Sequence, residues 1–179
     1  LKAHQNRHKL DLQVEEKGID GPVTRVDRYI EQLTIDTLRK SYKNHSFLGE
    51  EFGYQEGNGH DADWCWIIDP LDGTLNFING VPHFCVSIAV QHKGITQHGV
   101  IYDPVKDELF SASRGRGAML NQRRIRVNVK DSLEKTFMGV GHAFRKVRNG
   151  EVVSYAKNHF DSLLNVTEAG AQYRRSGSA

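Results

Sequence analysis

The chain has 179 residues, of which 38% are hydrophobic and 26% are charged, a composition typical of a globular domain with a substantial core. Its 24 lysines and arginines nearly balance 22 aspartates and glutamates, and the formal net charge of +2 does not require nucleic acid or an acidic membrane as a partner. No apolar run approaches the roughly 20 residues that cross a bilayer, and the apolar surroundings of Cys65 and Cys85 favour free thiols over a disulfide. We therefore expect a cytoplasmic protein with no membrane association and no direct DNA binding.

The first predicted element is a helix over residues 25–42. Residues 24–27 have the form of an N-terminal capping box. The apolar positions that follow recur at helical spacing, at Val26, Tyr29, Ile30 and Leu33. Residues 47–60 are rich in glycine and acids and have no period, which predicts a polar loop before a strand at 64–68 that ends at Asp69.

The middle of the chain predicts antiparallel sheet. Apolar residues alternate with small or polar ones over 84–90, a turn follows at Lys93 and Gly94, and a second strand covers 95–102, so we expect a β-hairpin. Further strands are predicted at 108–112 and on to Val129. Helical spacing returns over about 150–164. No convincing linker interrupts the chain, and we expect a single domain over 1–179.

The segment from Asp69 to Thr74 is the strongest candidate for chemistry. An apolar run meets a short predicted helix at 75–77 here, so a tight turn can aim the carboxylates of Asp69 and Asp72 at one point, and the N–H groups of Gly73 and Thr74 can receive a phosphate. Mg²⁺ prefers such carboxylates, and Glu50 or Glu51 can add another. Taken alone, an ordinary capped turn and a solvated acidic loop explain these patterns at least as well.

Several segments together resemble the inositol monophosphatase family, nearest to its bacterial SuhB-like branch. In their order and approximate spacing they are residues 22–27, 48–51 and 66–77, followed by 82–89, 100–104, 108–110, 114–118 and 174–179. The resemblance implies an α+β / α/β layered sandwich of the sugar-phosphatase type, with layers in the order αβαβα. This chain would hold mainly the N-terminal helix and antiparallel-sheet layers, over about 1–130, and the start of the C-terminal α/β layer, over about 131–179.

The same resemblance implies Mg²⁺-dependent hydrolysis of a small phosphorylated sugar or polyol, foremost inositol 1-phosphate, by water that two metal ions activate. The family uses two or three Mg²⁺ ions and is inhibited by lithium. The implied metal ligands are Glu50, Asp69, the backbone carbonyl of Leu71, and Asp72. The implied catalytic residues are Asp27 and Thr74, which orient and deprotonate the water, and Glu50; a capping role for Asp27 stays compatible with this. The implied substrate contacts are Leu71, Asp72, Gly73, Thr74, Arg174, Gly177, Ser178 and Ala179.

Two departures from the family pattern stand beside these expectations. Leu75 replaces a second threonine, and the sequence stops before the family's Trp-Asp motif, whose aspartate completes the second metal site. We therefore expect a chain shortened at both ends, with impaired turnover. The alternative function is that of a SuhB-like interaction protein that binds RNA polymerase and the antitermination machinery. Arg174 and Arg175 match the segment linked in that branch to dimer contacts, and a homodimer is expected.

Overall fold

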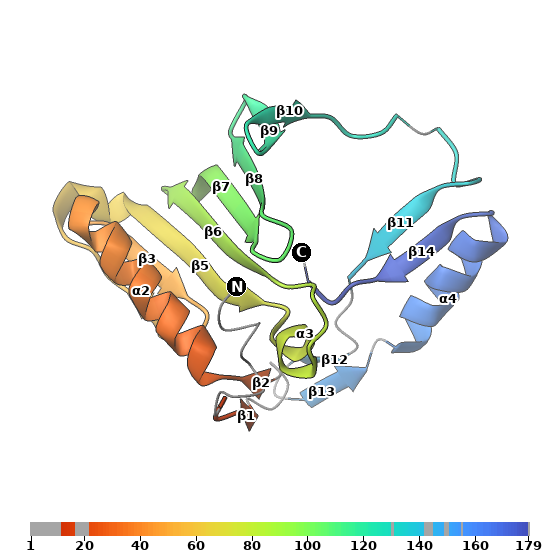
Figure 1. Ribbon diagram of the computed structural model, residues 1–179, viewed down its shortest axis with the longest axis horizontal. Helices are drawn as coiled ribbons and strands as arrows, with labels where there is room; N and C mark the ends of the chain where they lie inside the picture. Colours follow the sequence, from red (N-terminus) through yellow and green to blue (C-terminus); the bar gives the residue numbers. More distant parts are fainter. Residues whose placement is uncertain are drawn as a thin grey trace. The chain divides into compact units, whose positions relative to one another are not determined.

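The computed structural model describes residues 12–16, 22–129, 131–141, 145–148, 151–154 and 156–178 (Figure 1). The chain forms two compact units. Unit 1 comprises Leu1–Lys17, Gly21–Arg126 and Ser178–Ala179, and unit 2 comprises Gly18–Asp20 and Val127–Gly177. Among the described residues, no helix has both the length and the apolar character needed to cross a membrane.

Unit 1 is built on an eight-stranded mixed sheet with the order β10-β9-β8-β7-β6-β5-β3-β4. Its strands are β3 (Ser46–Gly49), β4 (Gly53–Gln55), β5 (Trp64–Asp72), β6 (Cys85–His92), β7 (Ile95–Asp103), β8 (Glu108–Ser113), β9 (Gly117–Leu120) and β10 (Arg123–Ile125). Every neighbouring pair is antiparallel except β3 and β5, which run parallel. The predicted antiparallel sheet and its β6–β7 hairpin are confirmed. Two short strands, β1 (Glu15–Glu16) and β2 (Pro22–Val23), form a separate antiparallel pair.

Helix α2 (Arg25–Ser41) confirms the first predicted helix to within one residue. Thr24 is its N-cap, and a complete capping box joins Thr24 and Asp27. The helix packs along the β3–β5 part of the sheet (Figure 1). Its fully buried Ile35 meets Phe47 of β3 and Ile68 of β5 in one core cluster. This contact fixes the helix against β3, which precedes Glu50, and against β5, which ends in the segment Asp69–Asp72.

Four expectations about element bounds are wrong. The strands predicted to reach Val129 end with β10 at Ile125, and the side chains of Val127 and Val129 beyond it are almost fully exposed. The predicted polar loop at 47–60 contains β3, β4 and the start of a short 3-10 helix, η3 (Gly59–Asp63), because Phe47 is buried in the core and β4 pairs with β3. The strand predicted to end at Asp69 continues to Asp72, which pairs with Cys85 beyond a bulge. Residues predicted to begin the last helix form strand β13, which fits their β-branched character at Val152 and Val153.

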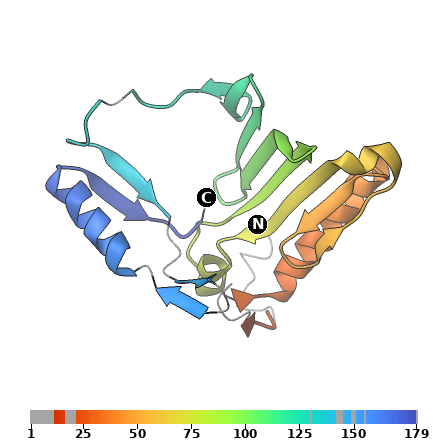
Figure 2. The same cartoon turned by 180° about the vertical axis from the view of Figure 1, so that it is seen from behind.

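Among its described residues, unit 2 contains a parallel strand pair, a hairpin and one helix. The paired strands are β11 (Phe137–Val140) and β14 (Gln172–Arg175). The chain between them forms the hairpin β12 (Arg145–Arg148) and β13 (Glu151–Ser154) and then helix α4 (Ala156–Glu168), which lies beside β14 (Figure 2). Parallel strands need such a crossover, and a helix is its usual form. This arrangement agrees with the predicted start of an α/β layer.

The turn between β7 and β8 is stabilised by the buried carboxylate of Asp103. Its Oδ1 accepts hydrogen bonds from the backbone N–H groups of Val105 (2.8 Å) and Lys106 (3.1 Å), and its Oδ2 lies 2.7 Å from Lys106 Nζ. Burial raises the pKa of the Asp103 carboxyl, but the Lys106 side chain and the two N–H groups together lower this pKa by more, so it lies below its ordinary value. The ionised form therefore stabilises the folded state.

We expect Asp103→Asn to lower the free energy of unfolding by about 1–2 kcal/mol near neutral pH, because the amide replaces a charged acceptor. The wild-type pKa is depressed by folding, so the contribution is fully present above the unfolded-state pKa of about 3.9 and is lost as pH falls from there through the lower folded-state pKa. Urea denaturation of both proteins at about pH 7 and about pH 3 measures the two differences. A difference that stays the same at both pH values would contradict this account.

Candidate functional site

Asp27 connects helix α2 to the segment Asp69–Thr74 of unit 1, which we call the acidic corner. Its side chain is 1% exposed. Asp27 Oδ2 accepts hydrogen bonds from Thr24 N at 2.8 Å and from Thr24 Oγ1 at 2.5 Å, while Asp27 Oδ1 accepts from Thr74 Oγ1 at 3.0 Å. One oxygen thus caps the helix and the other reaches Thr74. The capping role and the predicted approach to Thr74 are both present in the structure.

The corner itself is shaped by the bulge in β5. Asp69 pairs with Ser87 and Asp72 pairs with Cys85, and the register shifts between them. Beyond the bulge, Thr74 Oγ1 lies 3.0 Å from the carbonyl oxygen of Leu71 as well as 3.0 Å from Asp27 Oδ1. A hydroxyl carries a single proton, so Thr74 donates to one of these oxygens at a time.

Gly73 makes the close turn into helix α3 (Thr74–Asn79) possible. Its φ is +92°, in the left-handed region, and it is the N-cap of α3 with no side-chain cap. A Cβ atom at this position would lie 3.0 Å from Ser178 Cβ and 3.1 Å from the carbonyl oxygen of His83. The backbone conformation and the space both favour glycine here.

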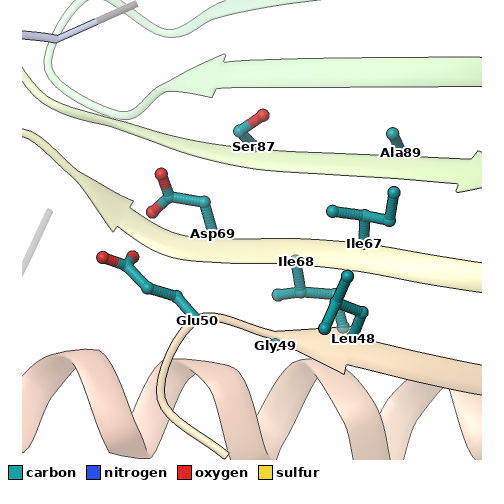
Figure 3. Close-up of a pocket in the computed structure, with 8 residues that line it drawn as sticks. All are labelled: Leu48, Gly49, Glu50, Ile67, Ile68, Asp69, Ser87 and Ala89. Carbon is teal, nitrogen blue, oxygen red and sulfur yellow. The ribbon is translucent and has the colours of Figure 1, made fainter. Parts of the chain in front are cut away.

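Glu50 and Asp69 are neighbours because of the parallel pairing of β3 with β5. Gly49, the last residue of β3, pairs with Ile68, so the residues that follow these two in the chain, Glu50 and Asp69, come to the same end of the ladder. Figure 3 shows the two carboxylates side by side at the edge of a pocket of about 280 Å³. The pocket is lined by Leu48, Gly49, Glu50, Ile67, Ile68, Asp69, Ser87 and Ala89. The predicted pair of metal-ligating acids is therefore brought together.

Electrostatic crowding distinguishes Asp69. Burial raises the pKa of its carboxyl, and the negative charge of Asp72 raises it further. A hydrogen bond with Glu50 opposes this rise, and the charge of Asp27 adds to it. The side chains that act on Asp69 are thus three other acids, and a cation placed among them would relieve their repulsion.

Asp72 lies against two other side chains. Ser178 Oγ is 2.9 Å from Asp72 Oδ2 and 3.1 Å from the Asp72 carbonyl oxygen, and the Cys85 thiol donates to Asp72 Oδ2 at 3.5 Å. Burial raises the pKa of Cys85 to about 11, so the thiol keeps the proton that it donates. Both cysteines are free, as predicted, although Cys65 is only partly buried. The predicted substrate contacts at 71–74 and Ser178 therefore gather at one place.

The other predicted substrate contacts are Arg174, Gly177 and Ala179. Arg174 and Gly177 are exposed residues of unit 2, where the Arg174 guanidinium lies 5.4 Å from the centre of the Phe137 ring. Ala179 lies outside the described residues. The roles of all three stay predictions.

The carboxylates of Glu50 and Asp69 suit Mg²⁺ better than a metal whose ligands must all be protein side chains. Among the residues that the structure describes, no three His, Cys, Asp or Glu side chains form a ready metal cluster. The adjoining carboxylates of Glu50 and Asp69 form a pair instead. Mg²⁺ is usually held by one or two carboxylates, with waters and phosphate oxygens completing its shell. The carboxylate pair therefore fits this ion.

Sequence reasoning missed Glu31. This residue is fully buried on the same face of α2 as Asp27, and its carboxylate accepts two backbone hydrogen bonds from the loop that carries Glu50. A signal was present in the sequence, because an acid one helical turn after Asp27 falls on the inward face of an amphipathic helix.

Comparison with known proteins identifies relatives over nearly the whole chain. The model of the inositol monophosphatase family matches residues 2–179. The Nus factor SuhB of Pseudomonas aeruginosa is 50% identical over 168 residues, which are 94% of this chain and 60% of that protein. The chain therefore spans less than two thirds of the length of this curated relative.

Solved structures give the same family relationship. The extragenic suppressor protein SuhB from Bartonella henselae is 36% identical, with a TM-score of 0.82 over 99% of this chain and 66% of that one. An IMPase from Thermotoga maritima is 29% identical, with a TM-score of 0.78 over 99% and 65% of the two chains. The predicted fold class of the phosphatase type is confirmed.

We expect Gly73→Ala to lower the free energy of unfolding by about 1–3 kcal/mol more than Gly115→Ala does. Both glycines have positive φ, at +92° and +74°, so both variants carry the left-handed strain. A Cβ at Gly115 meets nothing within 4 Å, whereas a Cβ at Gly73 meets three atoms at 3.0–3.3 Å. Chemical denaturation compares the pair, and equal losses would show that the corner accommodates the added methyl group.

Proposed function

The chain belongs to the inositol monophosphatase family, and from this membership we propose that it carries out Mg²⁺-dependent hydrolysis of a small phosphomonoester. The proposed substrate class is a phosphorylated sugar or polyol, foremost inositol 1-phosphate. The observation that supports this most is the gathering of the Glu50–Asp69 carboxylates beside the hydrogen-bonded Asp27–Thr74 pair in unit 1. The predicted homodimer and cytoplasmic location belong to the same proposal.

Glu50 and Asp69 would hold the first Mg²⁺ ion. When the Thr74 hydroxyl donates to Asp27 Oδ1, the Leu71 carbonyl oxygen receives no proton from Thr74, so it is proposed as a further ligand, and Asp72 as a ligand of a second ion. When bound, the ion supplies positive charge that offsets the charge of a phosphate and lowers the pKa of a coordinated water. The family's third ion and lithium inhibition stay expectations.

Asp27 and Thr74 would orient and deprotonate the attacking water. With the Thr74 hydroxyl donating to Asp27 Oδ1, the lone pairs of Thr74 Oγ1 are free to accept a proton from water. The water proton would pass to Thr74 Oγ1 while the Thr74 proton moves to Asp27 Oδ1. The two hydrogen bonds from Thr24 hold the other oxygen of Asp27 in place throughout.

The backbone at Gly73 and Thr74 would contact the phosphate. Gly73, the N-cap of α3, has no side chain that could cap the first turn, so the N–H groups of this turn are proposed to contact the phosphate. Ser178 Oγ, which lies against Asp72, is proposed as a substrate contact from the end of the chain. Arg174, Gly177 and Ala179 are proposed contacts on the strength of the family resemblance.

We expect Thr74→Val to lower kcat for phosphate release by about 10²–10⁴-fold, because valine keeps the shape of threonine but cannot relay a proton. Asp27→Asn should cause a similar loss, and the double variant should be no slower than the slower single one, since the two residues act as a unit. Phosphate release from a panel of phosphomonoesters, with and without Mg²⁺, measures these rates.

The matched control for the metal ligands is Asp63→Asn. Asp63 is an exposed acid before the opposite end of β5, where it pairs with Lys93. We expect Asp69→Asn to abolish Mg²⁺-dependent release and Asp63→Asn to leave it unchanged. Phosphate release that is indifferent both to Mg²⁺ and to Asp69→Asn would refute the metal mechanism.

A second candidate function is an interaction role in transcription antitermination. It is favoured by the relative named Nus factor SuhB, which is 50% identical over 168 residues. We propose RNA polymerase or its antitermination factors as partners, and Arg174 and Arg175, both exposed on β14, as contact residues. This role makes no use of the carboxylates of unit 1.

If the interaction role is correct, tagged protein should retain RNA polymerase or antitermination factors equally well as wild type and as Asp69→Asn, because that substitution leaves Arg174 and Arg175 unchanged. Arg174→Ala together with Arg175→Ala should reduce the retained amount. A pull-down with the purified factors measures both. No retention by the wild-type chain would leave the phosphatase as the supported function.

A further inference from the structure

Glu31 is the second buried acid of helix α2. It lies one helical turn after Asp27, on the same face, and its side chain is 0% exposed. A buried carboxylate is costly unless hydrogen-bond donors satisfy its oxygens. The donors that Glu31 uses therefore show which part of the structure depends on it.

Both donors come from the loop that follows β3. Glu31 Oε2 accepts a hydrogen bond from the backbone N–H of Glu51 at 2.8 Å, and Glu31 Oε1 accepts one from the N–H of Phe52 at 2.9 Å. Hydrogen bonds to a charged acceptor are about twice as strong as neutral ones. Because one rigid carboxylate receives two successive N–H groups, the direction of the chain at 51–52 is fixed relative to α2.

The preceding residues are fixed as well. A Cβ at Gly49 would fall 1.8 Å from Glu31 Oε1, so the carboxylate occupies the space above a glycine. The N–H of Glu50 donates to the carbonyl oxygen of Ile68 at 3.1 Å, next to Asp69 in β5. Glu50 is thus held by β5 through its own N–H and by Glu31 through the two residues after it.

We infer that Glu31 is the positioning residue that keeps the Glu50 carboxylate beside Asp69 in readiness for Mg²⁺. This inference rests on the proposed function. Asp27 and Glu31 then act in the same way on two segments. Asp27 fixes the acidic corner through its hydrogen bond with Thr74, and Glu31 fixes the loop after Glu50 through its two backbone hydrogen bonds. One helix face sets the relative position of two segments that lie about twenty residues apart along the chain.

Two substitutions separate position from charge. Glu31→Gln keeps the length of the side chain but sets an NH₂ group against one of the two N–H donors, and Glu31→Asp keeps the charge but withdraws the carboxylate. We expect each to raise the dissociation constant for Mg²⁺ by about 10–100-fold. We also expect amide hydrogen exchange at Glu51 and Phe52 in the metal-free protein to be faster by about tenfold or more.

Calorimetric titration with Mg²⁺ and NMR-detected exchange on the full 179-residue chain give both readouts. The matched control is Ile35→Val, which loosens the core one turn further along α2 without touching the loop, and its Mg²⁺ affinity should stay within about twofold of wild type. If Glu31→Gln does not fold, Glu31→Asp still decides the question.

The outcomes distinguish the two proposals. Wild-type protein that binds no Mg²⁺ would overturn the proposed function, and this inference with it. Wild-type binding together with undiminished binding by Glu31→Asp would overturn the inference alone, because the charge of Glu31, and not its position, would then be what matters. A loss of affinity in Ile35→Val as large as in the Glu31 variants would also overturn it.

Discussion

Two buried carboxylates on one face of α2 must find hydrogen-bond donors, and the rest of the site depends on where those donors lie. Asp27 takes them from Thr24 and Thr74, and Glu31 from the backbone of Glu51 and Phe52. Leaving such charges unsatisfied in the interior would cost several kcal/mol, on the order of the net stability of a small domain. Folding of the helix onto the sheet therefore also brings the corner and the Glu50 loop into place.

The register of the sheet adds a second constraint. Along β5, Ile68 packs into the core cluster with Ile35 of α2, while the side chains of its neighbours Ile67 and Asp69 belong to the opposite face of the sheet. Side chains alternate between faces, so a slip of one residue would bury Asp69 under α2 and expose Ile68. The apolar contact of Ile35 with Phe47 and Ile68 excludes that slip. The burial of Ile68 thus determines on which face of the sheet Asp69 lies.

Irregular backbone is concentrated at the same corner. The β5 bulge between Asp69 and Asp72 is followed directly by the left-handed turn at Gly73. Such features interrupt the regular ladder and leave carbonyl and N–H groups available to a ligand. The regular strands on either side hold these groups in fixed positions. A proposed Mg²⁺ and phosphate site at this point is consistent with the general division between a rigid scaffold and functional loops.

The sequence by itself determined the features that depend on near neighbours along the chain: the capped helix from Arg25, the β6–β7 hairpin, and an acidic corner ending in Gly73 and Thr74. Helical period, strand alternation and turn chemistry act over a few residues, so they can be read directly. Only the tertiary structure decided that residues 47–60 contain two strands, that β5 continues to Asp72, and that Glu31 supports Glu50. These outcomes rest on pairing and burial between distant segments, for which a local pattern carries no information.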